Sequence, residues 1–385
     1  MSSTFDAVVA GAGVFGAWTA LKLQRAGLRV ALLDAHGAGN SRASSGDESR
    51  IIRMGYGSDE IYTRSAMSSF EEWRALITDI ARPLFYRTGV LWLARRDSQY
   101  VIDTKNTLMR AGVPFEELSR SDLERRYPQI NLRDMDCGIL EPDSGVLMAR
   151  QLVHEVVQSA MKSGVTYWRQ GVLSPPANNK SRLNKIETSA GREINAGEFV
   201  FACGPWLPKL FPELLSDLIQ PTRQEVFYFG VPLGEIRFAP PALPVWIDFE
   251  DLVYAIPDVE GRGLKMAIDA HGAAVDPETM DRTVTAEGTD AVRKHLARRF
   301  PSLADAPIIE TRVCQYENTS NGDFLIDRHP GFENVWLVGG GSGHGFKHGP
   351  TVAGYVTALV TSDNQQIEPR FNLATKSAVQ HRKVY

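Results

Sequence analysis

The segment GAGVFG at residues 11–16 constrains the fold of this chain more than any other feature. It places Gly11, Gly13 and Gly16 in the pattern G-x-G-x-x-G, between an apolar run at 5–10 that predicts a strand and a periodic segment at 15–26 that predicts a helix. A second apolar run at 29–33 completes a strand–helix–strand unit. In such a unit the first glycine permits a tight turn, the second lets the backbone approach a pyrophosphate, and the third lets helix and strand pack closely. The segment therefore predicts a dinucleotide-binding fold.

Asp34 stands just after the second predicted strand, 18 residues beyond Gly16. An acidic residue at about 20 residues from the motif accepts hydrogen bonds from a ribose hydroxyl of the dinucleotide. The alternative is a solvated loop acid. The motif by itself does not separate FAD from NAD.

Length and composition bound the remaining possibilities. A chain of 385 residues with 43% apolar and 23% charged residues predicts two domains, each with a core. The formal charge of -4, without a Lys/Arg block, indicates neither a nucleic-acid nor a membrane partner. Cys137, Cys203 and Cys314 are widely spaced and odd in number, so we expect neither disulfides nor a metal site. We find no leader-like or membrane-spanning apolar segment and expect a cytoplasmic protein.

The hydrophobic pattern predicts a strand-rich middle region and a nucleotide domain built from both ends of the chain. Helices are predicted at 59–80, 121–126, 149–163 and 290–300, and a turn at 174–184. Strands are predicted at 90–94, 138–140, 198–202, 225–229, 245–247, 252–256, 264–268 and 335–338. We place the nucleotide domain at 1–85, 146–220 and 312–385, and the second domain at 86–145 and 221–311.

A second glycine cluster, GGGSGHGFKHGP at 339–350, follows the strand predicted at 335–338. Its backbone can pass close to a flat ligand because few side chains stand in the way. Pro350 suits the first turn of a following helix, whose positive end stabilises an anion such as a reduced flavin.

Five further segments complete a set of motifs: SRIIRMGYG at 49–57, EPDSGVL at 141–147, GLK at 263–265, VCQY at 313–316 and FLIDRHP at 324–330. With GAGVFG and SGHGFK at 342–347, they resemble the monomeric sarcosine oxidase and N-methyltryptophan oxidase family of the D-amino-acid-oxidase superfamily, over nearly the whole chain. The resemblance implies FAD rather than NAD, and an α/β fold in which a Rossmann-like FAD-binding domain carries an inserted β-rich substrate domain. It also implies a monomer that oxidises the C–N bond of a small amine with oxygen as acceptor.

The resemblance assigns cofactor contacts residue by residue. In the family, the cysteine of the VCQY segment carries the flavin through a thioether, which implies covalent FAD on Cys314; the alternative is a buried core thiol. The remaining implied contacts lie in the glycine segments, the segment before RIIR and the CGPW turn. Besides Gly11, Gly13, Gly16 and Asp34, they are Val14, Phe15, Ser45, Ser49, Arg50, Cys203, Gly204, Trp206, Gly340, Gly341, Gly343, His344, Gly345, Phe346 and Lys347.

The resemblance also implies a cationic substrate site. Arg53 and Lys347 match the residues that bind the substrate carboxylate, where an arginine can form two parallel hydrogen bonds and a lysine adds a point charge. Lys265 matches a lysine that promotes the reaction of reduced flavin with oxygen, because a cation stabilises superoxide-like charge. Arg50 matches a family arginine near the flavin and is a further catalytic candidate. The alternatives are surface charges or structural ion pairs for Arg53 and Lys347, a structural ion pair for Arg50, and a solvent-facing side chain for Lys265.

Tyr254, Tyr316 and His344 match residues that line the active site, although lone aromatic residues are more often core residues. Asp269 departs from the family, which has a histidine at this position. A second family histidine, before the RIIR segment, has no counterpart in this chain, which has Ser45 and Gly46 in that region. A carboxylate at 269 can bind a cationic or hydroxylated substrate or accept a proton from the amine, so we expect a larger or more polar amino acid than sarcosine. The alternative is that Asp269 caps a local turn.

These features predict an FAD-dependent oxidase that takes a hydride from the carbon beside the amine nitrogen, after which the imine hydrolyses and oxygen leaves as hydrogen peroxide. Two alternatives stay open. A dehydrogenase of the same fold would pass electrons to a quinone or carrier protein, and a flavin-binding scaffold would not turn over.

Overall fold

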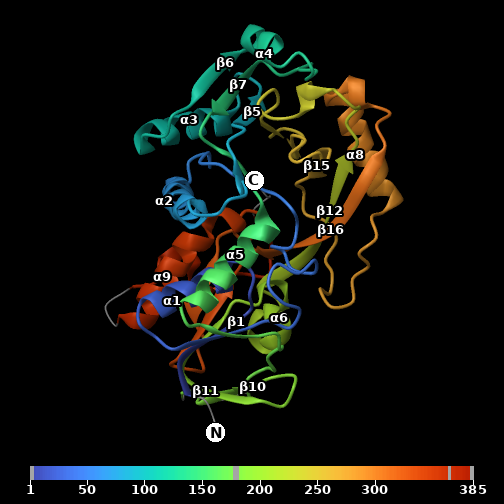
Figure 1. Ribbon diagram of the computed structural model, residues 1–385. Helices are drawn as coiled ribbons and strands as arrows, with labels where there is room; N and C mark the ends of the chain where they lie inside the picture. The colour runs from blue at the N-terminus through green and yellow to red at the C-terminus, as the bar shows by residue number, and fades with distance from the viewer. Residues whose placement is uncertain (1–3, 177–181, 363–365, 382–385) are drawn as a thin grey trace.

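The fold is known from a computed structural model, which describes residues 4–176, 182–362 and 366–381. Two large sheets occupy opposite halves of the molecule. Figure 1 shows β1 and β11 of the first sheet in the lower half and β5 and β7 of the second in the upper half. This combination of a largely parallel sheet and a second, largely antiparallel sheet is the α/β fold expected from the sequence.

The first sheet, called the parallel sheet below, has seven strands in the order β17-β18-β11-β1-β2-β9, with β10 also paired to β11. Only β17 and β10 run antiparallel to their neighbours. The bounds are β1 Thr4–Ala10, β2 Val30–Leu33, β9 Thr166–Trp168, β10 Lys185–Glu187, β11 Glu193–Phe201, β17 Leu325–Arg328 and β18 Val335–Gly339. Its strands therefore come from the beginning, the middle and the end of the chain.

Both faces of the parallel sheet are buried, which explains why its strands are continuous apolar runs. In β1, Ala7 and Val9 join one core cluster, whereas Val8 and Ala10 join another on the opposite face. This alternation follows from the two-residue period of a strand. The helices α1 (Val14–Arg25), α5 (Ala149–Lys162) and α9 (Gly349–Thr361) pack together on the first face. Residues of α6 (Leu207–Leu210) and α7 (Pro212–Leu215), which follow η1 (Gly204–Trp206), reach the core on the second face.

The second sheet, called the mixed sheet, has eight strands in the order β16-β12-β15-β14-β13-β5-β7-β6. Only the pair β13 and β5 is parallel. The bounds are β5 Val90–Ala94, β6 Glu116–Ser119, β7 Cys137–Glu141, β12 Ile219–Phe229, β13 Val245–Asp248, β14 Val253–Ile256, β15 Leu264–Ile268 and β16 Ile308–Thr319. The long pair β12 and β16 extends toward the parallel sheet, so residues on β16 can reach a site between the two sheets.

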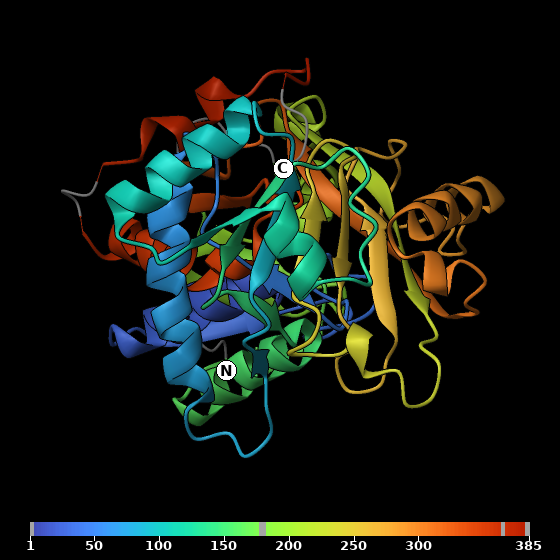
Figure 2. The same cartoon turned by 90° about the horizontal axis from the view of Figure 1, so that it is seen from above.

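Smaller elements surround the sheets. A three-stranded sheet joins β3 (Arg50–Ile52), β8 (Gly145–Leu147) and β4 (Phe85–Tyr86). Seen from above, α2 (Glu60–Ile77, blue) and α8 (Ala286–Arg299, orange) lie on opposite sides of the molecule (Figure 2). The other elements are α3 (Gln99–Ala111), α4 (Arg120–Arg126), η2 (Ile236–Phe238), η3 (Pro301–Leu303), η4 (Phe346–His348), η5 (Pro369–Phe371) and η6 (Leu373–Thr375).

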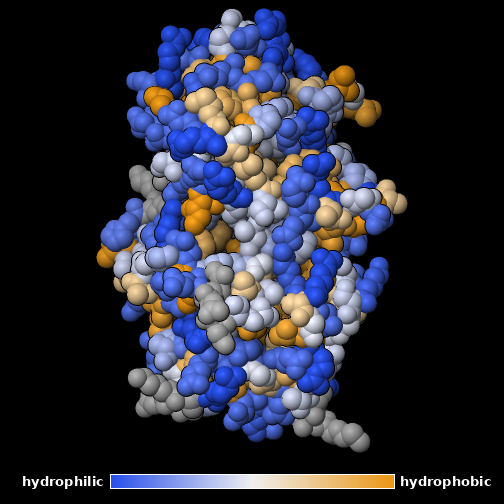
Figure 3. Space-filling view, turned by 90° about the vertical axis from the view of Figure 1, so that its left-hand side faces the viewer, coloured by the Kyte–Doolittle hydropathy of each residue, from blue (hydrophilic) through white to orange (hydrophobic). Residues whose placement is uncertain are grey.

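On the face shown in Figure 3, hydrophilic side chains predominate and hydrophobic ones are scattered among them. Among the described residues, no helix combines the length and the apolar character needed to cross a bilayer.

The structure confirms most predicted elements and corrects others. The strands predicted at 90–94 and 264–268 match β5 and β15 residue for residue. The strand predicted at 225–229 covers only the second half of β12, and no strand is predicted over β16, because polar residues interrupt the apolar pattern of both. The predicted turn at 174–184 lies partly outside the described residues, and the domain boundaries stay a prediction.

Candidate functional site

The first glycine segment links β1 to α1 and is closely packed at two of its three glycines. A Cβ on Gly11, whose φ is +99°, would lie 2.2 Å from the carbonyl oxygen of Ala202, and one on Gly16 would lie 1.9 Å from the carbonyl oxygen of Gly11. A Cβ on Gly13 would contact only the Ser45 Oγ, at 3.6 Å. Gly11 and Gly16 are thus required by backbone packing, whereas Gly13 borders open space that a ligand can fill.

Asp34 is built into the turn after β2. Its Oδ2 accepts a hydrogen bond from the Ala12 N–H at 2.8 Å, and its Oδ1 accepts from the N–H groups of His36 and Gly37, each at 2.8 Å. This ordered, half-buried position differs from that of a solvated loop acid. A carboxylate has about four acceptor sites, so Asp34 can still accept a bond from a hydroxyl.

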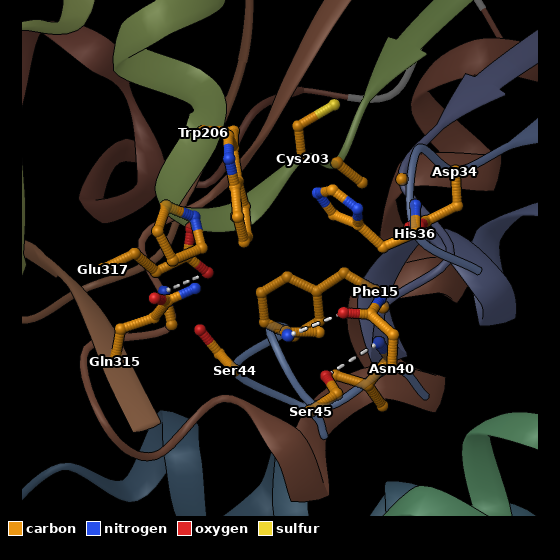
Figure 4. A pocket seen from close by; sticks show the side chains of 18 of the residues that line it. Phe15, Asp34, His36, Asn40, Ser44, Ser45, Cys203, Trp206, Gln315 and Glu317 are labelled. Atoms are coloured by element: carbon orange, nitrogen blue, oxygen red, sulfur yellow. Dashed lines mark hydrogen bonds between the residues drawn. The ribbon is translucent and has the colours of Figure 1, made fainter. Parts of the chain in front are cut away.

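A cavity of about 370 Å³, called the nucleotide cavity, lies beside the first glycine segment (Figure 4). Its walls come from both glycine segments, the turn before η1 and the strand β16. The predicted cofactor residues that line it are Gly11, Gly13, Val14, Phe15, Asp34, Ser45, Arg50, Cys203, Gly204, Trp206, Gly341, Gly343, Gly345 and Phe346. The predicted cofactor residues Ser49, Cys314, His344 and Lys347 line a second cavity instead, and Gly16 and Gly340 line neither cavity.

The wall of the nucleotide cavity carries unsatisfied polar atoms. Ser44 Oγ and Glu317 Oε2, labelled residues in Figure 4, are buried and have no hydrogen-bond partner within the described parts of the chain. Burial raises the pKa of Glu317 to about 7, although the Gly341 N–H donates to its other oxygen. Because buried polar atoms are nearly always paired, these two indicate a polar ligand. The glycine-lined space and these acceptors fit a dinucleotide such as FAD.

A second cavity of about 80 Å³, called the substrate cavity, adjoins the first. Arg50 and Tyr316 line both cavities, which places the second at one end of the nucleotide site. All eight residues that the sequence assigns to catalysis or substrate binding line the substrate cavity: Arg50, Arg53, Tyr254, Lys265, Asp269, Tyr316, His344 and Lys347. Ser49 and Cys314 line it as well.

Lys265 lies at the centre of a buried charge cluster. Its Nζ is 2.6 Å from Asp47 Oδ2 and 2.8 Å from the carbonyl oxygen of Ser49, and only 1% of the residue is exposed. The alternative of a solvent-facing lysine is therefore wrong. Burial lowers the pKa of Lys265 to about 8, even though Asp47 opposes this shift. Asp47 also pairs with Arg50 and accepts from the Tyr228 hydroxyl at 3.0 Å.

Arg53 and Lys347 lie together beside Tyr56. The Arg53 guanidinium stands over the rings of Tyr56 and Trp92, at 4.3 and 4.7 Å from their centroids. Lys347 Nζ donates to the Tyr56 hydroxyl at 2.8 Å and to the carbonyl oxygen of His344 at 3.0 Å. Burial, reinforced by the Arg53 charge, holds the pKa of Lys347 well below its ordinary value. An arginine cation beside a lysine that becomes charged when it gains an anionic partner favours an anionic ligand in this enclosed cavity.

Asp269 follows β15 and faces Tyr316 on β16. The Tyr316 hydroxyl donates to Asp269 Oδ1 at 2.6 Å, and Asp269 lines the substrate cavity. Burial raises the pKa of Asp269 to about 6, opposed by Tyr316 and by the cations Arg53 and Lys347. Burial also raises the pKa of Tyr254, on the adjoining strand β14.

The two site cysteines differ in surroundings. Cys314 Sγ is 3.3 Å from an Arg50 guanidinium nitrogen, and the residue lines the substrate cavity. Cys203 Sγ donates to the carbonyl oxygen of Ala10 at 3.4 Å, and Figure 4 shows its sulfur pointing away from the centre of the nucleotide cavity.

Sequence reasoning missed several residues that the structure brings to the site. Asp47 is the counter-ion of Lys265, Glu317 and Ser44 line the nucleotide cavity, and Tyr56 contacts Lys347. For Asp47 a signal existed, because a lysine inside an apolar strand needs an acidic partner. Tyr56 stood inside the recognised segment 49–57 and Glu317 directly after the segment 313–316, but a lone sequence position does not show the direction of its side chain.

The chain matches the family described as "DAO: FAD dependent oxidoreductase" over residues 6–359. It belongs to this family. The protein therefore takes FAD as its cofactor. The nucleotide cavity is the site that this chain offers to FAD, and the substrate cavity adjoins it.

Relatives along almost the whole chain include the monomeric sarcosine oxidase of Streptomyces avermitilis, which is 30% identical over 370 residues and covers 93% of this chain and 94% of the relative. The peroxisomal sarcosine oxidase of Homo sapiens is 31% identical over 382 residues, which cover 96% of this chain and 94% of the relative. The N-methyl-L-tryptophan oxidase of Salmonella heidelberg is 29% identical over 356 residues, with 90% and 92% covered. The expected resemblance to these enzymes is confirmed.

Solved structures share the fold at lower identity. L-proline dehydrogenase from P. horikoshii has a TM-score of 0.83 at 20% identity, with 97% of this chain and 98% of that chain covered. The amino acid oxidase NikD has a TM-score of 0.79 at 22% identity, with 96% and 98% covered. At these identities the likeness concerns the fold alone.

Proposed function

We propose that this protein is an FAD-dependent oxidase of a small amine that carries a carboxylate. One observation supports the proposal above all others: the eight chemically active residues from distant parts of the sequence line one 80 Å³ cavity that adjoins the nucleotide cavity. The names of the relatives, sarcosine oxidase and N-methyl-L-tryptophan oxidase, support an N-methyl or other secondary amine.

In this proposal each residue of the substrate cavity has one task. Arg53 and Lys347 bind the carboxylate and thereby orient the amine. Bound FAD would supply the acceptor for a hydride from the carbon beside the nitrogen, and it would supply the electrons that reduce oxygen. Lys265, held by Asp47, supplies a fixed cation that stabilises negative charge on oxygen. The imine formed from the substrate then hydrolyses in water. In this proposal the protein acts as a monomer.

Asp269 gives the substrate cavity its specificity in this proposal. Its carboxylate, bound to the Tyr316 hydroxyl, binds a positively charged or hydroxylated part of the substrate or accepts a proton from the amine. The 80 Å³ volume favours a compact substrate, so we favour a more polar amino acid over a larger one.

We also propose that Cys314 carries the FAD through a thioether. Its place in the lining of the substrate cavity, next to Arg50 at the junction with the nucleotide cavity, supports this assignment.

An anaerobic screen of amines with purified holoenzyme tests the function. Carboxylate-bearing amines should bleach the yellow absorbance, and admission of air should restore it with one hydrogen peroxide formed per substrate. Bleaching without peroxide would favour the dehydrogenase, and no bleaching by any amine would favour the scaffold. If sarcosine proved the best substrate, the specificity assigned to Asp269 would be wrong.

A further inference from the structure

A chain of hydrogen bonds runs from the substrate cavity to helix α2. Lys347 Nζ lies 2.8 Å from the Tyr56 hydroxyl, which lies 2.8 Å from His348 Nε2. His348 Nδ1 lies 2.9 Å from the hydroxyl of Ser65, a half-buried residue on α2. Lys347 lines the substrate cavity, whereas the lining excludes Tyr56, His348 and Ser65. These three side chains therefore connect the cavity with the outer part of the fold without contacting its contents.

The direction of these hydrogen bonds depends on the charge of Lys347. A lysine ammonium only donates, so the Tyr56 oxygen accepts from Lys347 and its own hydrogen points to His348 Nε2. With Lys347 charged, the His348 proton then lies on Nδ1 and is donated to Ser65. With Lys347 neutral, every bond can reverse: Ser65 donates to His348 Nδ1, His348 Nε2–H donates to Tyr56, and Tyr56 donates to Lys347 Nζ. A competing contact, from the Tyr56 hydroxyl to His344 Nδ1, is longer at 3.4 Å. Hydroxyl and imidazole groups can each accept a proton on one side while releasing one on the other.

The charges around the chain make its inner end sensitive to an anion. Arg53 and Arg50 disfavour the charged form of Lys347, and Asp269 and Glu141 favour it. Lys347, His344 and Arg53 all disfavour the charged form of His348, which is fully buried. Burial is the largest cause of the low pKa of both groups. A carboxylate bound at Lys347 adds negative charge and favours its ammonium form.

We propose that Ser65, His348 and Tyr56 form a proton relay that delivers one proton to Lys347 Nζ when the substrate carboxylate binds, and returns it when the product leaves. This proposal rests on the proposed function, in which Lys347 binds that carboxylate. During uptake, Tyr56 gives its hydroxyl proton to Lys347, His348 gives its Nε2 proton to Tyr56, and Ser65 gives its proton to His348 Nδ1. Water replaces the proton on Ser65, so one solvent proton is consumed and no electrons are exchanged.

Tyr56, His348 and Ser65 are positioning residues, because they act on the substrate only through Lys347. A merely structural His348 would hold Tyr56 in place by the same hydrogen bonds. The variant His348→Gln separates the two roles, since an amide oxygen can accept from Tyr56 and an amide N–H can donate to Ser65, but an amide does not pass protons on readily. Ser65→Ala removes the outer end of the relay. Ser69→Ala is the matched control, because Ser69 lies one turn further along α2 and bonds Thr351 instead.

The experiment mixes FAD-loaded enzyme with acetate at about pH 8 in weakly buffered solution, and follows binding by the flavin spectrum and proton uptake by a pH indicator. We expect the wild-type protein and Ser69→Ala to take up a proton as acetate binds. We expect His348→Gln and Ser65→Ala to bind acetate at about pH 6 within about threefold of the wild-type affinity, but to take up the proton about tenfold more slowly at about pH 8.

Two results would overturn the relay while leaving the carboxylate site intact: acetate binding to wild-type enzyme without proton uptake, or uptake by His348→Gln at the wild-type rate. If acetate and other small carboxylates failed to bind at all, the carboxylate site itself would be wrong, and the relay with it.

Discussion

Asp47 Oδ2 and Lys265 Nζ form a 2.6 Å ion pair in which both side chains are 2% exposed. Burial alone would raise the pKa of Asp47, but the cations Lys265 and Arg50 hold it well below its ordinary value. Asp47 therefore stays ionised, and it supports the charged form of a lysine whose own pKa is only about 8. The charge of the proposed oxygen-reactive lysine thus depends on one carboxylate.

Replacing Asp47 with Asn should slow the reaction with oxygen. Without the carboxylate, burial and Arg50 push the pKa of Lys265 further down, so the lysine loses its charge near neutral pH. We expect reoxidation of reduced enzyme, followed by stopped-flow absorbance, to slow by about tenfold or more. Tyr228→Phe, which removes a hydrogen bond to Asp47 but leaves its charge, should have a much smaller effect. Equal reoxidation rates in Asp47→Asn and wild type would contradict the role of this pair.

Arg53→Met should weaken substrate binding. A charge-assisted hydrogen bond contributes about 1.5–3 kcal/mol, so we expect KM for a carboxylate-bearing amine to rise by roughly 10- to 100-fold. Steady-state kinetics measure this, with Arg64→Met, an exposed arginine paired to Glu60 on α2, as the control. An unchanged KM in Arg53→Met would remove Arg53 from the carboxylate site.

The activity should depend on the ionisation of Asp269. Its pKa of about 6 means that the carboxylate is protonated below this pH and charged above it. Because binding a cationic group or accepting a proton requires the charged form, kcat/KM should rise as pH increases through about 6. In Asp269→Asn this rise should disappear, whereas Asp276→Asn, an exposed acid paired to Lys209, should keep it. A rise that persists in Asp269→Asn would assign it to another group.

Cys314→Ser should release its flavin. Acid-precipitated wild-type protein should stay yellow and have an intact mass increased by that of FAD, because a thioether survives denaturation. Cys314→Ser should give a colourless pellet and a yellow supernatant. Cys203→Ser, at the other cavity cysteine, should behave like the wild type. A wild-type mass equal to that of the bare polypeptide would rule out the covalent bond.

The sequence was most informative where local geometry leaves little choice. The segment GAGVFG predicts a tight turn in which position 11 must be glycine. Strands β1 and β2 are buried on both faces, so their sequences are continuous apolar runs that are easy to identify. Strand β16 escaped prediction because its polar residues line a ligand cavity rather than a core. The resemblance supplied the eight substrate-cavity residues, but it could not supply Asp47 as the partner of Lys265, because that contact joins positions 218 residues apart.

The parallel sheet draws its strands from three distant stretches of the chain, and the nucleotide cavity inherits this arrangement. Gly13 and Asp34 are translated well before Gly341 and Phe346. Part of the cofactor's binding surface is therefore missing until the second glycine segment has been synthesised. The complete FAD site therefore forms only in chains that contain both glycine segments, and bound FAD stabilises the folded form of those chains.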